Sequence, residues 1–150
     1  MRGAMKPFFR GFVYAFRGII SCVREERNFR FHLGAAFHLF VYLPFFRVTR
    51  AETGVLVILC ALVLSLEAMN SALERAVNCT GEYSERAGMA KDMAAGAVLV
   101  AAIASVIGGV VILWQPDAFA AMGRFFVRHP AAILAEAVFL IVWITSMRNA

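Results

Sequence analysis

Two glutamates and two asparagines recur on one side of a short stretch of the sequence. Glu67, Asn70, Glu74 and Asn78 follow one another at intervals of three to four residues. In a helix, at about 100° per residue, these positions lie within roughly 80° of one another. Two carboxylates on one face can hold a divalent metal through oxygen ligands, or one of them can act as a general base. Both kinds of chemistry serve phosphoryl transfer, and the spacing alone leaves both open.

The stretch that precedes this face is apolar. Thr53–Leu66 contains no charged residue, and the helical pattern continues to Val77, so residues 53–77 are predicted to span a membrane with polar groups at one end only. Ionisable groups at the end of a span are costly unless they pair, bind a metal or serve a polar cavity. The face is therefore a candidate functional site. The alternative is structural: the two glutamates hydrogen-bond neighbouring helices or reach the lipid headgroups.

The composition also favours a membrane protein. Of 150 residues, 61% are apolar, against roughly 45–50% in soluble proteins, and the mean hydropathy is +0.73. Fifteen Lys and Arg against ten Asp and Glu give a net charge of +5, which suits either nucleic acid or an anionic membrane surface. Because the sequence is so apolar, we interpret the charge as directed at a membrane and expect no nucleic-acid partner.

Hydropathy predicts an all-α integral membrane protein with a surface helix and several spans. The first helix carries aromatic residues on one stripe and arginines on another, as helices that lie in the membrane interface do. The next apolar segment is short and crosses only with its flanks. The elements are a surface helix at 8–30, spans at about 31–46, 53–77 and 94–114, a connector at 115–130 and a fourth span at 131–147. Residues 1–114 thus form the core and 115–150 an accessory part.

Basic residues predict which ends of the spans face the cytoplasm. Four spans place both termini on one side, which then carries eleven Lys and Arg against four on the other. The positive-inside rule puts the N-terminus and the loop at 78–92 in the cytoplasm. Arg75, Arg86 and Lys91 on that side are candidates to neutralise phosphate charge. No glycine-rich phosphate loop of the known kinds occurs, so any ATP site is built from helices.

Longer motifs surround the polar face. The run EAMNSALE at 67–74 is followed by AKDM at 90–93 and preceded by YAFRG at 14–18 and ERNFR at 26–30. In this order, over about residues 8–114, they resemble the small bacterial integral-membrane diacylglycerol kinase and undecaprenol kinase family. The resemblance implies a surface helix and three spans, in a homotrimer with shared active sites. It also implies ATP- and Mg²⁺-dependent phosphorylation of a lipid hydroxyl at the cytoplasmic face of the bacterial inner membrane.

The resemblance assigns roles to individual residues. Glu67 corresponds to the general base, and Asn70 to the polar partner between the two glutamates. Glu26 and Glu74 correspond to the metal-binding carboxylates. The positions that match ATP contacts are Tyr14, Glu26, Glu74, Glu82, Lys91 and Asp92, and the candidates for phosphate or lipid contacts are Arg10, Arg17 and Arg30.

One departure from the diacylglycerol kinase pattern bears on the substrate. Phe31-His32 stands where diacylglycerol kinases typically have Gln-Glu, and it is similar to the undecaprenol kinase branch. We therefore expect phosphorylation of undecaprenol to undecaprenyl phosphate, with diacylglycerol as the alternative substrate. A small proton-coupled transporter is a more remote alternative, because a transporter would place its carboxylate near the bilayer midplane.

Overall fold

The computed structural model describes residues 2–79, 81 and 84–148, and all regular structure in these residues is helical. The elements are α1 (Arg2–Glu25), α2 (Arg27–Tyr42), a 3-10 turn η1 (Leu43–Phe45), α3 (Arg50–Cys79), α4 (Glu85–Leu113), α5 (Pro116–Arg128) and α6 (Pro130–Arg148). This confirms the all-α fold class. By length and apolar composition, α3, α4 and α6 are able to cross a membrane.

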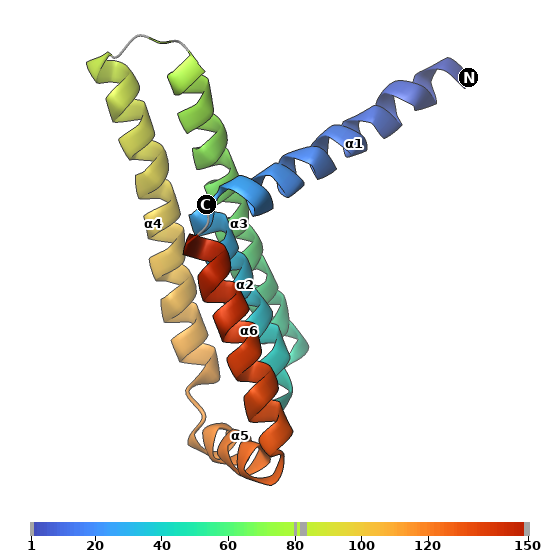
Figure 1. The fold of residues 1–150 in the computed structure, drawn as a ribbon, viewed down its shortest axis with the longest axis vertical. Helices are drawn as coiled ribbons and strands as arrows, with labels where there is room; N and C mark the ends of the chain where they lie inside the picture. The colour runs from blue at the N-terminus through green and yellow to red at the C-terminus, as the bar shows by residue number, and fades with distance from the viewer. Residues whose placement is uncertain (1, 80, 82–83, 149–150) are drawn as a thin grey trace.

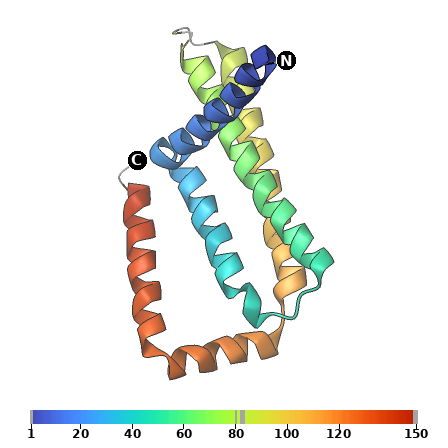
Figure 2. The same ribbon diagram turned by 90° about the vertical axis from the view of Figure 1, so that its right-hand side faces the viewer.

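The helices form an elongated bundle with α1 leaving it at one end (Figure 1). Antiparallel α3 and α4 pack most closely together, α2 packs against α3, and α6 packs against α2. The short helix α5 lies across the opposite end of the bundle and joins α4 to α6 (Figure 2). The C-terminal end of α6 therefore returns to the junction between α1 and α2.

Small side chains on α4 allow its close approach to α3. Ala101 is buried, and the Ser105 hydroxyl donates to the Ala101 carbonyl at 2.8 Å while lying 3.4 Å from the Leu59 carbonyl of α3. A side chain on Gly108 would collide with Leu59. In a bilayer the hydrophobic effect does not drive helices together, because lipid tails are as apolar as the side chains. Helices there associate instead through close contact between their backbones.

The predicted surface helix at 8–30 is wrong at its C-terminal end. Glu26 adopts an extended conformation, with φ −107° and ψ 110°, which ends α1 at Glu25 and starts α2 at Arg27. The carbonyls in the last turn of a helix need donors. The Arg30 guanidinium supplies them by donating from Nη1 to the carbonyls of Val23 and Arg24, at 3.2 and 2.8 Å. We call this junction the elbow, residues 23–30.

Two predicted spans have different bounds in the structure. The helical part of 31–46 is α2, whose 16 residues extend about 24 Å, short of a hydrocarbon core of about 30 Å. It ends before Pro44, which lies in the η1 turn. In contrast, α4 starts at Glu85 rather than near residue 94, because the Ser84 side chain caps the helix by accepting from the Ala87 amide.

The predicted connector at 115–130 joins α4 to α6, and most of it is the helix α5, which the sequence analysis did not anticipate. Pro116 stands in its first turn, where a missing N–H costs nothing. Aromatic rings of α5 pack on the end of α2 and on the following turn, in the pairs Phe126–Tyr42, Phe125–Phe45 and Phe119–Phe46. The Gln115 side chain accepts from the Arg47 amide at 3.0 Å and donates to the Arg47 carbonyl at 3.3 Å, which ties this end of the bundle together.

Docking of α6 on α2 combines a close contact with two polar ones. The Trp143 ring occupies the space that a side chain at Gly34 would fill. Its indole Nε1 donates to the Arg30 carbonyl at 3.0 Å. One turn after Gly34, His38 Nε2 lies 2.7 Å from Glu136 Oε1. Glu136 of α6 therefore has a polar partner on α2.

Gly34→Ala tests this contact. Because the new methyl group collides with Trp143, we expect the free energy of unfolding in detergent to fall by about 1–3 kcal/mol. In a Trp143→Ala background the same substitution should cost less than about 0.5 kcal/mol, since the two changes are coupled only through this contact. Gly96→Ala is the matched control, because nothing lies within 4 Å of a side chain at that position of α4. Equal losses in both backgrounds would contradict the docking described here.

Candidate active site

The polar face predicted on α3 exists as one continuous helical surface. Glu67 is 3% exposed and Asn70 is 9% exposed, whereas Glu74 is half-buried and Asn78 is exposed. The Ser71 hydroxyl is buried among them and donates to the Glu67 backbone carbonyl at 3.1 Å. The face therefore runs from the interior of the bundle to its open end.

The elbow between α1 and α2 brings a second set of polar groups to this face. The extended backbone at Glu26 leaves its side chain free to reach toward α3. The side chain of Asn28 hydrogen-bonds the Glu67 carboxylate, and Glu26 and Glu74 lie near enough to Glu67 for their negative charges to repel it. Phe29, at 6% exposure, anchors the start of α2. Three carboxylates from two chain segments thus lie in one region.

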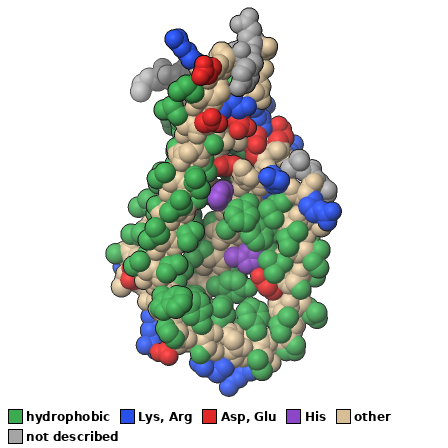
Figure 3. Space-filling model, turned by 90° about the vertical axis from the view of Figure 1, so that its left-hand side faces the viewer, with side chains coloured by type: hydrophobic (Ala, Val, Ile, Leu, Met, Phe, Trp, Pro, Cys, Tyr) green, Lys and Arg blue, Asp and Glu red, His purple; other side chains and the backbone are tan. Residues whose placement is uncertain are grey.

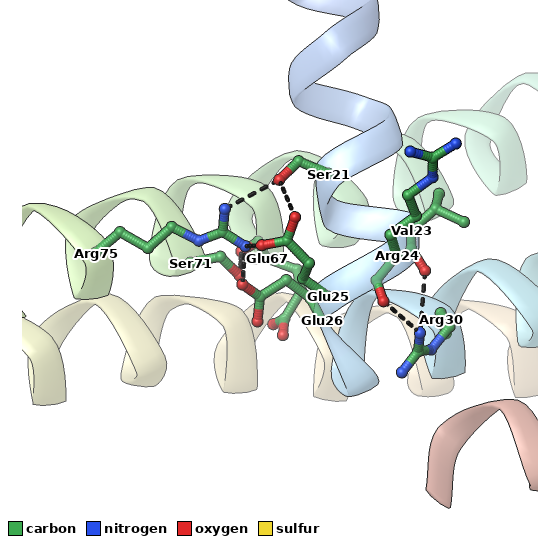
Figure 4. A network of polar contacts seen from close by, with 9 residues as sticks. All are labelled: Ser21, Val23, Arg24, Glu25, Glu26, Arg30, Glu67, Ser71 and Arg75. Atoms are coloured by element: carbon green, nitrogen blue, oxygen red, sulfur yellow. Dashed lines mark hydrogen bonds and ion pairs between the residues drawn. The ribbon is translucent and has the colours of Figure 1, made fainter. Parts of the chain in front are cut away.

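Arg75 joins α3 to the end of α1 (Figure 4). Its Nη2 lies 2.6 Å from Glu26 Oε1 and 3.1 Å from Glu25 Oε2, and its Nη1 donates to the Ser21 hydroxyl at 3.0 Å. The sequence suggested this arginine as a neutraliser of phosphate charge. Here its guanidinium is engaged by two carboxylates and acts as a link between helices.

Negative charge on the α3 face is left without a cation in the described part of the chain. Arg75 pairs with Glu26, but no Lys, Arg or His pairs with Glu67 or Glu74 among those residues. The side-chain oxygen of Asn70 is buried and accepts no hydrogen bond from any residue that the structure describes. Hard divalent cations such as Mg²⁺ take carboxylate and amide oxygens as ligands. The donor set therefore fits Mg²⁺, although the described residues contain no group of three acidic, His or Cys side chains close enough to enclose a metal.

The structure brings together only some of the predicted site residues. Lys91 of α4 faces α3 with its Nζ 3.4 Å from Asn78 Oδ1, while Asp92 beside it is exposed. Arg30 belongs to the elbow. Three further candidates, Arg10, Tyr14 and Arg17, are exposed on α1, which projects from the bundle in Figure 1. Glu82 lies outside the described residues.

Tyr14 in particular is far from the carboxylates of its own chain. It is 63% exposed, and eleven residues of α1 separate it from Glu25. At 1.5 Å per residue that is about 16 Å along the helix. A single chain therefore does not assemble the residue matched to the adenine contact with those matched to the metal.

Sequence reasoning missed two parts of the site. The hydrogen bond between Asn28 and Glu67 joins residues 39 positions apart. The ion pair between Arg75 and Glu26 joins residues 49 positions apart. The only sequence signal for Asn28 was its place inside the ERNFR motif. Neither contact follows from helical periodicity, because each depends on where the elbow falls.

A thiol on α1, Cys22, lies near the Glu26 carboxylate. Burial raises the pKa of Cys22 on α1 above its ordinary value, and the negative charge of Glu26 adds to the increase. The reactive form of cysteine is the thiolate. The raised pKa therefore disfavours the thiolate form of Cys22.

Comparison with known proteins identifies most of the chain. Residues 13–113 match the prokaryotic diacylglycerol kinase family. An undecaprenol kinase of Bacillus subtilis is 38% identical over 112 residues, which are 74% of this chain and 91% of that protein. Diacylglycerol kinases of Synechocystis and Escherichia coli K12 are both 39% identical, over 70% and 68% of this chain and 61% and 84% of their own lengths. No solved structure matches the chain.

Arg75→Gln tests the link between α3 and α1. Arg75 is exposed to solvent, which screens the pair, so we expect the free energy of unfolding to change little. Amide hydrogen exchange in the last turns of α1, residues 19–25, should become faster. In the unmodified protein, local opening of these turns has to break the Arg75 ion pairs, and in the variant that cost is absent. Arg86→Gln, which removes the same charge from an exposed position on α4, is the control. Unchanged exchange in the Arg75 variant would show that the link does not hold α1.

Proposed function

We propose that this chain, which belongs to the prokaryotic diacylglycerol kinase family and is a lipid kinase, transfers the γ-phosphoryl group of ATP to undecaprenol. Family membership over residues 13–113 supports the kinase activity and leaves no support for a transporter. The observation that carries the site assignment is the buried pair Glu67 and Asn70 on α3, with Glu74 on the same face and Glu26 opposite.

Glu67 is placed to act as the general base. Its carboxylate is buried, is oriented by the Asn28 side chain and has no cation partner in the described residues, so it is free to accept a proton. When it takes the proton of the lipid hydroxyl, that oxygen attacks the γ-phosphorus of ATP. The bond from the γ-phosphorus to its bridging oxygen breaks, and ADP leaves with the electron pair. Proton removal and charge neutralisation are what such a transfer needs from a protein.

Glu74 takes a different role because of its distance from Glu67. Seven residues separate the two, which is about 10 Å along α3. Glu74 lies nearer the open end of the bundle, where the phosphates of ATP arrive from water, and with Glu26 it would hold Mg²⁺. Bound Mg²⁺ supplies charge neutralisation for the phosphate oxygens. Lys91, which reaches toward Asn78 from α4, completes the phosphate-binding side.

The site is shared between subunits of a homotrimer in this proposal. Tyr14 and the arginines of α1 are exposed and lie well away from the carboxylates of their own chain. A neighbouring subunit that accepts α1 across its α3 face would bring Tyr14 to the nucleotide. The chain thus carries both halves of a site, each directed at a different neighbour.

An apolar cavity supports undecaprenol as the substrate. A space of about 340 Å³ between α2, α3 and α4 is lined by Phe31 and His32, the residues that replace Gln-Glu, and continues past Cys60 toward Gly109. Figure 3 shows that hydrophobic side chains cover much of one face of the bundle. Aromatic and apolar lining suits a polyprenyl chain better than a Gln-Glu pair would. The relative named as an undecaprenol kinase supports the same choice, and those named as diacylglycerol kinases define the alternative.

The distribution of charge supports an active site at the cytoplasmic face of the bacterial inner membrane. The end of the bundle that carries Glu67, Glu74 and the elbow also carries most of the Lys and Arg residues. Basic residues are retained on the cytoplasmic side of spanning segments. ATP then arrives from the cytoplasm while the lipid diffuses laterally to the same end.

Glutamine substitutions separate the two carboxylate roles. Glu67→Gln should lower kcat by about 10²–10⁴-fold while ATP binding changes less than about twofold, as expected when a base is removed. Glu74→Gln should abolish turnover at saturating Mg²⁺, because a metal-binding charge is lost while the size of the side chain is kept. The measurements are steady-state kinetics and nucleotide binding on the purified protein. Near wild-type turnover of Glu74→Gln would refute its assignment.

Competition between lipids tests the substrate. With undecaprenol and diacylglycerol in one mixed micelle, the ratio of labelled products gives the ratio of the two kcat/KM values directly. We expect the higher kcat/KM for undecaprenol. Changing Phe31-His32 to Gln-Glu should shift the ratio toward diacylglycerol, since it removes the apolar lining of the cavity entrance. A preference for diacylglycerol in the unmodified chain would refute the substrate while leaving the lipid kinase assignment intact.

A further inference from the structure

A second apolar groove lies along the seam between α2 and α6, close to the elbow. Its volume is about 300 Å³, and it is lined by Leu33 and Phe37 of α2 and by Phe139 and Val142 of α6. Val142 is 60% exposed, so the groove opens sideways to the surroundings of the bundle. Arg30 stands at its end nearest the elbow.

Arg30 has hydrogen-bonding capacity that the described residues do not satisfy. Its Nη1 donates to the two carbonyls that end α1, but its Nε and Nη2 are buried and have no partner there. Hydrogen bonds to charged donors are among the strong ones, and leaving such donors buried and unpaired is costly. The position therefore favours an acceptor that carries negative charge.

The carboxylates of the elbow do not supply that acceptor. Figure 4 shows Glu25 and Glu26 turned toward Arg75 on one side of the elbow, while the Arg30 guanidinium lies on the other side. Around it, Arg24 and Arg27 are exposed on the elbow, and Arg148 is exposed at the end of α6 that returns to this point. The α6 side of the elbow is therefore basic.

This groove is separate from the cavity that we assign to the substrate. On α2 it is lined by positions 30, 33, 34 and 37, whereas the substrate cavity is lined by positions 31, 32, 35, 36 and 39. At about 100° per residue, the two sets are centred on opposite sides of the helix. The other wall is α6, which lies beyond the family match at residue 113. The groove is thus formed by the C-terminal extension of this chain.

We propose that the groove between α2 and α6 binds an anionic phospholipid that is not the substrate. Its phosphate oxygens accept from Nε and Nη2 of Arg30, and one acyl chain lies along Leu33, Phe37 and Phe139. The combination of a charged donor at the end of the bundle with an apolar channel leading away from it matches a headgroup and its chain. A free phosphate offers the same acceptor oxygens without the chain, so the test has to separate the two.

Lipid binding to the delipidated full-length protein tests the proposal without turnover. We expect native mass spectrometry and thermal unfolding to detect phosphatidylglycerol binding about fivefold or more tighter than phosphatidylcholine with the same chains, because basic residues near the site favour net negative charge. Inorganic phosphate should give no comparable protection. Equal binding of the two lipids, or protection by phosphate as strong as by phosphatidylglycerol, would overturn the proposal.

Two variants attack the site from different sides. Arg30→Gln removes the donors and should weaken phosphatidylglycerol binding about tenfold or more, the worth of a charged hydrogen bond. Val142→Trp fills the open groove without contacting the elbow and should weaken phosphatidylglycerol binding to a similar extent. This variant still tests the proposal if the Arg30 variant does not fold. Arg86→Gln, with the same loss of charge on α4, should change binding less than twofold. Undiminished binding in Val142→Trp would refute the site.

Discussion

The arrangement of this chain depends on the way the elbow at Glu26 is held. An abrupt change of direction leaves helix carbonyls without donors and places a carboxylate in an extended stretch. Two arginines supply the partners, one from the elbow itself and one from α3. Arg30 takes the carbonyls of Val23 and Arg24, and Arg75 takes the carboxylate. With these contacts made, α1 leaves the bundle while Glu26 and Asn28 stay against α3. The surface helix and the polar face are therefore set by one junction.

The polar face shows how a membrane helix can carry carboxylates that it does not neutralise itself. Glu67 is buried beside an amide and two other negative charges, which is unfavourable for folding in the absence of a cation. In the function proposed above, a bound cation would relieve this repulsion. The position of the face at the end of α3 suits that proposal, since ions and nucleotide would arrive from water.

Much of this could be predicted from sequence, for reasons that differ by element. The α3 face followed from spacing, because a continuous apolar helix fixes the register of Glu67, Asn70 and Glu74. The break at Glu26 could not be predicted, since periodicity continues across it and only the reach of Arg30 reveals the change of direction. The helix α5 was missed because its aromatic residues acquire partners only when α2 ends beside them. The first failure concerns a contact between residues seven positions apart, and the second concerns contacts between segments distant in sequence.

The contact between Gly34 and Trp143 has a consequence for reading related sequences. The Trp143 ring fits against α2 only because Gly34 has no side chain, so the two positions depend on each other although they are 109 positions apart. A glycine here paired with a tryptophan late in a C-terminal extension serves as a joint signature of a docked fourth segment. Chains that carry the extension but a bulky residue at the glycine position must attach it by a different geometry.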